Sequence, residues 1–244
     1  MKRHTTPAVA MSLCLGFSLS ATGATAATKA QQPKSCAVDK GQDVDACRKS
    51  GDASDDAERV GEVTKRQLDA TVSACSKLLF GDRSVCNRAG ALRYIGTAYL
   101  GAGDPDKAIE YHSKAFAVMP GYHLAVEERA KAYLKLRKFD EAVADFKQAA
   151  GLDESEGHGA NDYMALGFLY NMRGEYDVAI DYMNKAIERM PDGEIYRDNK
   201  SEFYRRRGQY WSNKGDTARA EADFAKAKEL AAKPQSTVAP PRFE

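Results

Sequence analysis

The amino-acid sequence predicts an all-α protein built from stacked helical hairpins. Apolar residues recur at steps of three and four, as at Leu68, Val72, Cys75 and Leu79, which is the spacing of one face of an α-helix. No stretch alternates apolar and polar residues for long enough to predict a strand. Breaks between the helical segments recur at similar intervals, which indicates that one hairpin is repeated along the chain.

Residues 1–26 have the order of a secretory signal peptide: basic residues, an apolar run at 8–19, and small residues at 24–26 that form an A-x-A cleavage site. The apolar run is short for a membrane span. The bulky residue before Cys14 argues against lipid attachment there. We therefore expect cleavage after residue 26, export to the periplasm or the cell exterior, and no stable membrane insertion of the mature chain. An uncleaved N-terminal anchor is the alternative.

Composition and charge narrow the classes of function. Hydrophobic residues make up 43% of the chain and charged residues 29%, as in an ordinary folded domain. The 36 basic and 35 acidic side chains nearly cancel. A nucleic-acid partner is not expected, because such proteins usually carry a clear basic excess.

The packed part of the chain is predicted at 55–232, between two polar segments. All 12 tyrosines lie between Tyr94 and Tyr210. Residues 27–54 are predicted to be a flexible or disulfide-looped lead-in, and residues 233–244 a disordered tail.

Four cysteines remain after cleavage, namely Cys36, Cys47, Cys75 and Cys86. An even number in an oxidising compartment predicts disulfides, with three possible connectivities. The two sequential pairs each enclose ten residues, which favours Cys36–Cys47 and Cys75–Cys86. The alternative is Cys47–Cys75 with the other two cysteines unpaired. No C-x-x-C motif is present, so a redox site of that type is not predicted.

Glycine and proline set the period of the hairpins. Gly-Asp or Gly-Glu breaks occur at 103–104, 174–175 and 215–216, and Pro120 and Pro191 end two further helices. The aligned units begin near residues 89, 123, 160 and 201.

This repeat resembles the tetratricopeptide repeat (TPR), a helical hairpin of 34 residues. The first unit matches its pattern at Leu92, Ile95, Gly96, Tyr99, Gly103, Ala108, Ala115 and Pro120. The third matches at Tyr163, Leu166, Gly167, Tyr170, Gly174, Ala179, Ala186 and Pro191. The second and fourth match at fewer positions, and His112 stands where the first unit should have an aromatic residue. The resemblance implies a right-handed α-solenoid of about four hairpins plus a degenerate N-terminal unit. The unit bounds are near 55–88, 89–122, 123–159, 160–200 and 201–232.

Two positions of the repeat change together. Positions 7 and 23 hold Arg129 with Asp145 in the second unit and Arg207 with Asp223 in the fourth. The first and third units hold apolar and aromatic residues there. These positions face each other across the hairpin in TPR proteins, so we expect two partly buried, bidentate Arg–Asp ion pairs.

The resemblance also implies a binding groove along the first helix of each unit. Carried over, its residues include Arg93, Thr97, Glu127, Lys131, Lys135, Met164, Phe168, Asn171, Arg205 and Gln209. Such a groove suits an extended peptide or partner helix with apolar anchors and some acidic character. The Lys/Asn carboxylate clamp of chaperone-binding relatives is not reproduced.

The sequence offers no catalytic motif, metal-binding spacing or phosphate-binding loop, so no catalytic residue, metal or other cofactor is predicted. His112 is expected in the core, and Met164, Met172, Met183 and Met190 are expected to fill packing faces. The leading hypothesis is a non-enzymatic adaptor or scaffold of the periplasm or cell envelope that binds a protein or peptide. The alternatives are a structural subunit of an envelope complex, and a small enzyme or ligand binder that uses residues 27–65.

Overall fold

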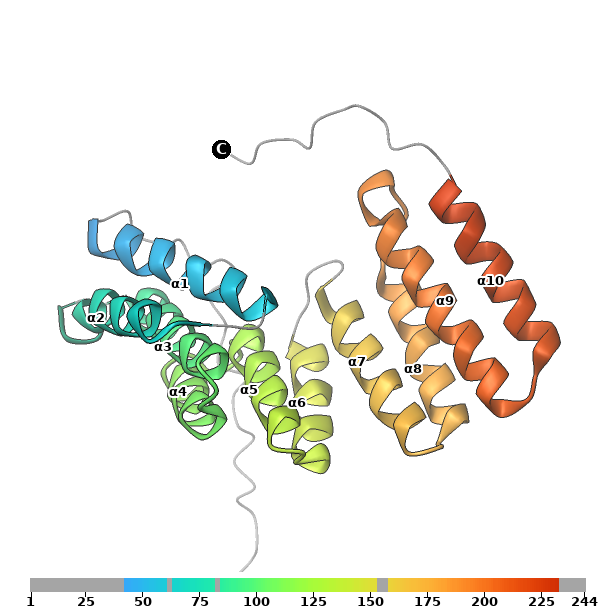
Figure 1. The fold of residues 1–244 in the computed structure, drawn as a ribbon, viewed down its shortest axis with the longest axis horizontal. Coiled ribbons are helices and arrows are strands. Elements are labelled where there is room, and N and C mark those ends of the chain that lie inside the picture. The colour runs from blue at the N-terminus through green and yellow to red at the C-terminus, as the bar shows by residue number, and fades with distance from the viewer. Residues whose placement is uncertain (1–41, 61–62, 82–83, 153–157, 233–244) are drawn as a thin grey trace, which may run out of the picture. The chain divides into compact units, whose positions relative to one another are not determined.

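The computed structural model describes residues 42–60, 63–81, 84–152 and 158–232 (Figure 1). Within these ranges the chain is helical and contains no strand. The helices are α1 Gln42–Val60, α2 Lys65–Gly81, α3 Val85–Gly101, α4 Pro105–Val118, α5 His123–Lys135, α6 Phe139–Leu152, α7 His158–Met172, α8 Tyr176–Arg189, α9 Arg197–Lys214 and α10 Thr217–Ala232, with a 3-10 turn η1 at Glu194–Tyr196.

Neighbouring helices pack as hairpins, and each hairpin packs on the next. The four predicted units are the pairs α3/α4, α5/α6, α7/α8 and α9/α10. Helices α4, α6 and α8 each also contact the first helix of the following pair. The predicted all-α stack of hairpins is confirmed. The predicted signal peptide and tail lie outside the described residues.

Left-handed backbone turns separate the two helices of each hairpin. Gly103, Gly174 and Gly215 have φ values of 82°, 76° and 91° and follow the first helices of their units. Glycine adopts this conformation without the steric cost that a Cβ brings. Arg137 stands at this place in the second unit with φ 58°, so the fold keeps the turn there even without glycine.

Close contact between the helices of a hairpin depends on one small residue. A Cβ added to Gly96 would lie 2.7 Å from the ring of His112, and one added to Gly208 would lie 2.9 Å from the ring of Phe224. Real Cβ atoms do not approach other atoms so closely. Both pairs occupy positions 8 and 24 of their units, so the second helix places a ring directly against the backbone of the first.

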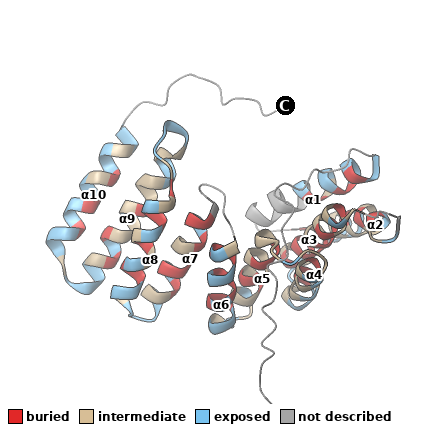
Figure 2. Cartoon of the chain, turned by 180° about the vertical axis from the view of Figure 1, so that it is seen from behind, coloured by how far each residue is buried: buried red, intermediate tan, exposed pale blue. Residues whose placement is uncertain are grey.

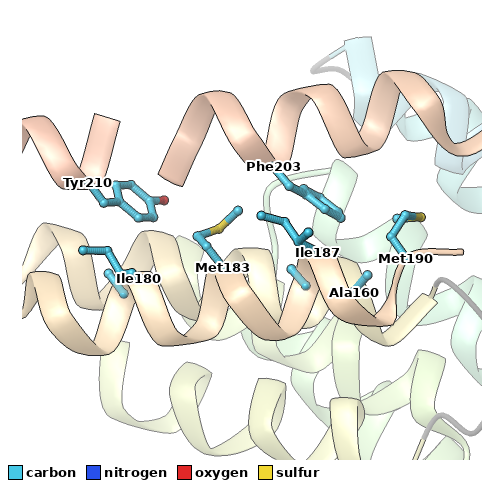
Figure 3. Close-up of a cluster of buried hydrophobic side chains, with 9 residues drawn as sticks. Ala160, Ile180, Met183, Ile187, Met190, Phe203 and Tyr210 are labelled. Atoms are coloured by element: carbon cyan, nitrogen blue, oxygen red, sulfur yellow. The ribbon is translucent and has the colours of Figure 1, made fainter. Parts of the chain in front are cut away.

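Buried residues lie mainly on the sides of the helices that face other helices, and exposed residues lie mainly on the outer sides (Figure 2). A cluster between α8 and α9 contains Met183, Ile187 and Phe203, which are 0%, 9% and 1% exposed (Figure 3). Met190 joins this cluster at 3% exposure. The prediction that Met183 and Met190 fill the core is confirmed.

Helix α1 corrects the predicted N-terminal boundary. The flexible lead-in at 27–54 is wrong from Gln42 onward, because α1 is a helix that packs on both α2 and α3. Val44, Cys47 and Gly51 lie on its buried side, at helical spacing. A Cβ at Gly51 would overlap the ring of Tyr94, so only glycine permits this approach. Residues 27–41 lie outside the described residues.

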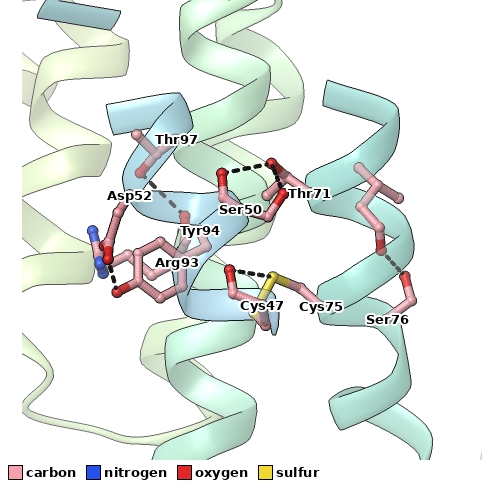
Figure 4. Close-up of a disulfide and its surroundings, with 10 residues drawn as sticks. Cys47, Ser50, Asp52, Thr71, Cys75, Ser76, Arg93, Tyr94 and Thr97 are labelled. Carbon is pink, nitrogen blue, oxygen red and sulfur yellow. Dashed lines mark hydrogen bonds between the residues drawn. A yellow bond between two sulfur atoms is a disulfide. The ribbon is translucent and has the colours of Figure 1, made fainter. Parts of the chain in front are cut away.

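The disulfide in this region is Cys47–Cys75, with a Cα–Cα distance of 4.5 Å (Figure 4). The favoured pairs Cys36–Cys47 and Cys75–Cys86 are therefore wrong, and the alternative Cys47–Cys75 pair is confirmed. The physical reason is that Cys47 lies on a helix packed against α2, and not in a flexible segment. The alternative also left Cys86 unpaired. That part is wrong, because Cys86 is disulfide-bonded. Cys36 lies outside the described residues.

Both predicted Arg–Asp pairs form, and both are bidentate. Arg129 donates to the Asp145 carboxylate at 2.7 and 2.8 Å, and Arg207 donates to Asp223 at 2.8 and 2.7 Å. The aspartate side chains are only 9% and 8% exposed. The hydrogen bonds that the arginines donate to these carboxylates raise the pKa of both arginines. Each pair therefore joins the two helices of its own hairpin.

The third nitrogen of each arginine reaches back to the preceding hairpin. Arg129 Nη1 donates to Ser113 Oγ at 3.1 Å, and Arg207 Nη1 donates to Asn184 Oδ1 at 2.7 Å. Ser113 and Asn184 are both at position 25 of their units. Each arginine thus fixes three helices, which the sequence pattern alone did not predict.

Tyrosine stacks take the place of the ion pairs in the other two units. Tyr111 stacks on Tyr99 with ring centroids 5.4 Å apart, and Tyr182 stacks on Tyr170 at 5.5 Å. Tyr111 and Tyr182 occupy position 23, where the second and fourth units have aspartate. The alternation along the sequence is therefore an alternation of two ways to join a hairpin.

His112 is the buried polar residue at the centre of the first hairpin. Its side chain is 0% exposed, and neither ring nitrogen has a hydrogen-bond partner. Burial lowers the pKa of His112 from 6.5 to about 4. Glu128 opposes this shift, whereas Arg93, Lys131 and Arg129 add to it. The imidazole is therefore neutral at neutral pH.

Removing one member of the Arg129–Asp145 pair should destabilise the protein strongly. We expect Arg129→Met to lower the free energy of unfolding by about 3–5 kcal/mol, because a nearly buried carboxylate loses its counterion. The double variant Arg129→Met with Asp145→Tyr should lose much less, since it resembles the first and third units. Urea unfolding measures both. Arg173→Met, which breaks a more exposed pair with Asp140, is the control and should change stability by about 1 kcal/mol or less. Equal losses in the single and double variants would contradict the pairing.

His112→Phe should stabilise the protein and flatten its pH dependence. Phe224 against Gly208 shows that a phenyl ring fits this pair of positions. The pKa of His112 is about 4 in the folded chain and 6.5 when unfolded. The unfolded state therefore binds the proton first, and stability falls as the pH drops from 6.5 to 4, by about 3 kcal/mol in all. The variant lacks this loss. Unfolding curves of both proteins at pH 7, 5.5 and 4 test this prediction. If the free energy of unfolding falls equally with pH in the two proteins, the prediction is contradicted.

Candidate functional site

An exposed apolar stripe runs along α7. It consists of Met164, Phe168 and Met172, which are spaced four residues apart and so share one helix face. Phe168 is 43% exposed and Met172 is 57% exposed, while Met164 is partly buried. The prediction that Met172 fills the core is therefore wrong. We call these three residues the α7 stripe, and a contiguous apolar surface of this kind is a candidate contact surface.

An amide pair lies beside the α7 stripe. Asn213 Nδ2 on α9 donates to Asn171 Oδ1 on α7 at 2.9 Å. This bond uses one half of each amide. The Asn171 amide nitrogen and the Asn213 amide oxygen remain for solvent or for the backbone of a bound segment. The structure thus brings the predicted site residue Asn171 next to α9.

The predicted cation on α5 is neutralised within its own helix. Lys131 Nζ lies 3.0 Å from Glu127 Oε1 and 2.8 Å from Glu128 Oε1. Burial lowers the pKa of Lys131, but the two carboxylates raise it by more, so the net shift is upward. Lys131 stays charged, and its charge is already offset. Lys135, one turn further along, is exposed.

The predicted cation on α9 also pairs within its own helix, with a carboxylate, Glu202, that Arg206 shares. Arg205 forms a bidentate pair with Glu202 at 2.6 and 2.7 Å, and this hydrogen bonding raises the pKa of Arg205. Gln209, one turn further along, is exposed and uncharged. The pairs of Lys131 and Arg205 remove much of the reason to expect an acidic partner.

The α3 end of the predicted groove differs from the expectation. Thr97 is 2% exposed and donates its hydroxyl to the Arg93 carbonyl at 3.2 Å, so its prediction as a groove residue is wrong. Helix α1 packs against α3 at this end of the chain, which accounts for a more closed surface. The Arg93 guanidinium lies over the ring of Tyr94, 4.2 Å from its centroid.

The described residues contain no group of three or more histidine, cysteine, aspartate or glutamate side chains that could hold a metal ion. None of the described helices is both long enough and apolar enough to cross a membrane.

The tetratricopeptide repeat family matches residues 127–194 of the chain. Curated relatives match less than half of the chain. Small glutamine-rich tetratricopeptide repeat-containing protein 2 of Mycosarcoma maydis is 29% identical over 110 residues, which is 45% of this chain and 30% of that protein. NADPH oxidase activator 1 of Rattus norvegicus is 30% identical over 114 residues, 41% of this chain and 25% of the relative. The chain thus spans about a third or less of these relatives.

Solved structures share the fold over more of the chain. A crystal structure of MamA is 26% identical, covers 68% of this chain and 90% of its own, and superposes with a TM-score of 0.56. The nearly identical TPR-like repeats of a kinesin light chain from Podosopora anserina are 14% identical, cover 81% and 100%, and give a TM-score of 0.61. The second likeness shows the fold alone.

Phe168 should matter little for folding, although it is a large apolar residue. Phe168→Asp should change the free energy of unfolding by about 1 kcal/mol or less, because much of its ring is already in water. Leu166→Asp on the same helix should unfold the protein, since Leu166 is 0% exposed and belongs to the core. Thermal unfolding by circular dichroism measures both variants. A large loss for Phe168→Asp would show that the α7 stripe is a packing surface.

Proposed function

We propose that this chain, a tetratricopeptide-repeat solenoid, is an exported, non-enzymatic adaptor that binds an apolar segment of a partner protein on the α7 stripe. Tetratricopeptide repeats generally mediate contacts between proteins, which supports a binding role. The observation that carries the proposal is the exposure of Phe168 and Met172 on one helix face, next to the partly buried Met164.

Packing explains Met164, which contacts the core cluster between α8 and α9, but not the exposed residues Phe168 and Met172. Met164, Phe168 and Met172 occupy positions 5, 9 and 13 of the third unit. The second and fourth units have polar or charged residues at all three positions, namely Glu127, Lys131 and Lys135, and Arg205, Gln209 and Asn213. The repeat therefore folds without apolar residues there, and a bound partner explains the presence of Phe168 and Met172 in the third unit.

The surroundings of the stripe favour apolar anchors over charged ones. Three residues at steps of four span about 12 Å, the length of two helical turns or of an extended tetrapeptide. The Asn171–Asn213 pair can add hydrogen bonds to a peptide backbone. Lys131 pairs with two carboxylates, and Arg205 pairs with Glu202, which it shares with Arg206. We therefore propose a neutral, apolar segment as the ligand.

Export is supported by the order of residues 1–26 and by the cysteines. Disulfides persist mainly in oxidising compartments. Cys47 and Cys75 are paired and 2% and 0% exposed. A buried disulfide between two packed helices agrees with folding in the periplasm or outside the cell.

Photocrosslinking in the native host tests the proposal. A photoreactive phenylalanine analogue replaces Phe168 in one strain and Ile195 in another. Ile195 is the control because it is 70% exposed and lies in η1, outside the stripe. We expect one discrete adduct from position 168 and none of that mass from position 195. Adding Met172→Asp should remove the adduct, and deleting residues 2–26 should also remove it, because the partner is then out of reach.

Two results would count against this function. Equal adducts at both positions would mean that the stripe is not a binding site. An unchanged adduct after deletion of residues 2–26 would contradict export while leaving the stripe in place as the binding site.

A further inference from the structure

The α7 stripe has a thioether at each end. Met164 and Met172 lie four residues before and four residues after Phe168, on the same face of the helix. Leucine is of similar size and is also apolar, so an apolar surface does not by itself require sulfur at these positions. Methionine differs from leucine in one chemical respect, because mild oxidants convert its thioether into a polar sulfoxide and cells can reverse that step.

The five methionines within the described ranges differ widely in exposure. Met172 is 57% exposed. Met119 and Met164 are partly buried. Met183 and Met190 are 0% and 3% exposed and lie in the core between α8 and α9 (Figure 3). Because an oxidant must contact the sulfur to react, dissolved oxidants should attack Met172 first among these five.

We propose that Met172 is a reversible oxidation site that switches off binding on the α7 stripe. The oxidants that act on it are peroxides, and the enzymes that reverse the change are methionine sulfoxide reductases. This inference rests on the proposed function, because it describes how binding on that same stripe is regulated.

The oxidation consumes one molecule of hydrogen peroxide for each thioether. The Met172 sulfur donates an electron pair to one peroxide oxygen, the oxygen–oxygen bond breaks, and the other oxygen leaves as water. In the reverse step, two thiols of the reductase supply two electrons and two protons. The sulfur–oxygen bond then breaks, and the products are the thioether, a disulfide and water.

The fold tolerates an added oxygen at Met172 but not in the core. More than half of the surface of Met172 is in water, and Met172 is the last residue of α7. In contrast, the sulfur of Met183 lies 3.1 Å from the position of a Cβ on Gly167, in the closest part of the third hairpin. Oxidation at Met183 would therefore disrupt packing, whereas oxidation at Met172 changes only the surface.

A sulfoxide at position 172 makes one end of the stripe polar. Its oxygen accepts hydrogen bonds from water, and an apolar partner that covers it removes these bonds. The neutral, apolar segment proposed as the ligand has no donor side chain to replace them. We therefore expect oxidation of Met172 to weaken binding by about tenfold.

The selectivity of oxidation is the first test. The purified full-length chain is treated with hydrogen peroxide, and peptide mass spectrometry follows each methionine with time. We expect Met172 to be oxidised at least about tenfold faster than Met183, with no change in the circular dichroism spectrum. The chain unfolded in guanidinium chloride is the control, because the two residues should then react at equal rates. Equal rates in the folded chain would overturn the proposal.

The effect on binding is the second test. The purified chain with the photoreactive analogue at position 168 is oxidised or left untreated, the peroxide is removed, and both samples are illuminated in an extract of the native host. We expect oxidation to lower the yield of the discrete adduct by about tenfold, and methionine sulfoxide reductase to restore it. Met172→Leu is the matched control, because leucine keeps the stripe apolar and does not react with peroxide. Met172→Gln, which is permanently polar and of similar size, should give a low yield without peroxide.

The outcomes separate this regulation from the function that it controls. An equal yield before and after oxidation of Met172 would overturn the regulation and leave the stripe in place as a binding site. An equal loss of yield in the chain with Met172 and in Met172→Leu would assign the effect to another residue and would also overturn it. The absence of any adduct from the untreated chain would contradict the proposed function, and the regulation with it.

Discussion

The contact on which the fold depends is the close approach of two helices at positions 8 and 24 of each unit. Gly96 and Gly208 leave no space for a Cβ, because a ring from the second helix lies against the backbone of the first. At Gly167 the thioether of Met183 plays the same part, with its sulfur 3.1 Å from the position of a Cβ. Once this distance is set, the neighbouring positions 7 and 23 must also meet.

The meeting of positions 7 and 23 links the hairpins in pairs. In the first and third hairpins, an apolar residue at position 7 and a stacked tyrosine at position 23 join the two helices of the hairpin. In the second and fourth hairpins the arginine also bonds to position 25 of the hairpin before it. The second unit is therefore tied to the first, and the fourth to the third, by the same hydrogen bond. The structural period of the chain is two hairpins.

The repeated hairpins could be predicted from the sequence because their signals are local. Turn glycines, helical spacing and the Arg129–Asp145 pattern lie within one unit. Helix α1 could not be predicted, since the part of its buried side with described side chains, up to residue 52, consists of Val44, Cys47 and Gly51 in a polar segment. Because α1 was not predicted, the disulfide pairs and the exposure of Thr97 were also predicted wrongly. The error at Met172 has another cause, because helical spacing alone does not tell which face of α7 remains uncovered.

The positions that determine the fold and the positions available for binding are different residues of the same repeat. Positions 7, 8, 23 and 24 are restricted to a few combinations, because they meet inside each hairpin. Positions 5, 9 and 13 of the last three units vary from charged to apolar without any change in the hairpin. Selection for folding acts on the first set and leaves the second set free. The exposed apolar residues of the second set, Phe168 and Met172, are therefore better explained by what their hairpin contacts than by how it folds.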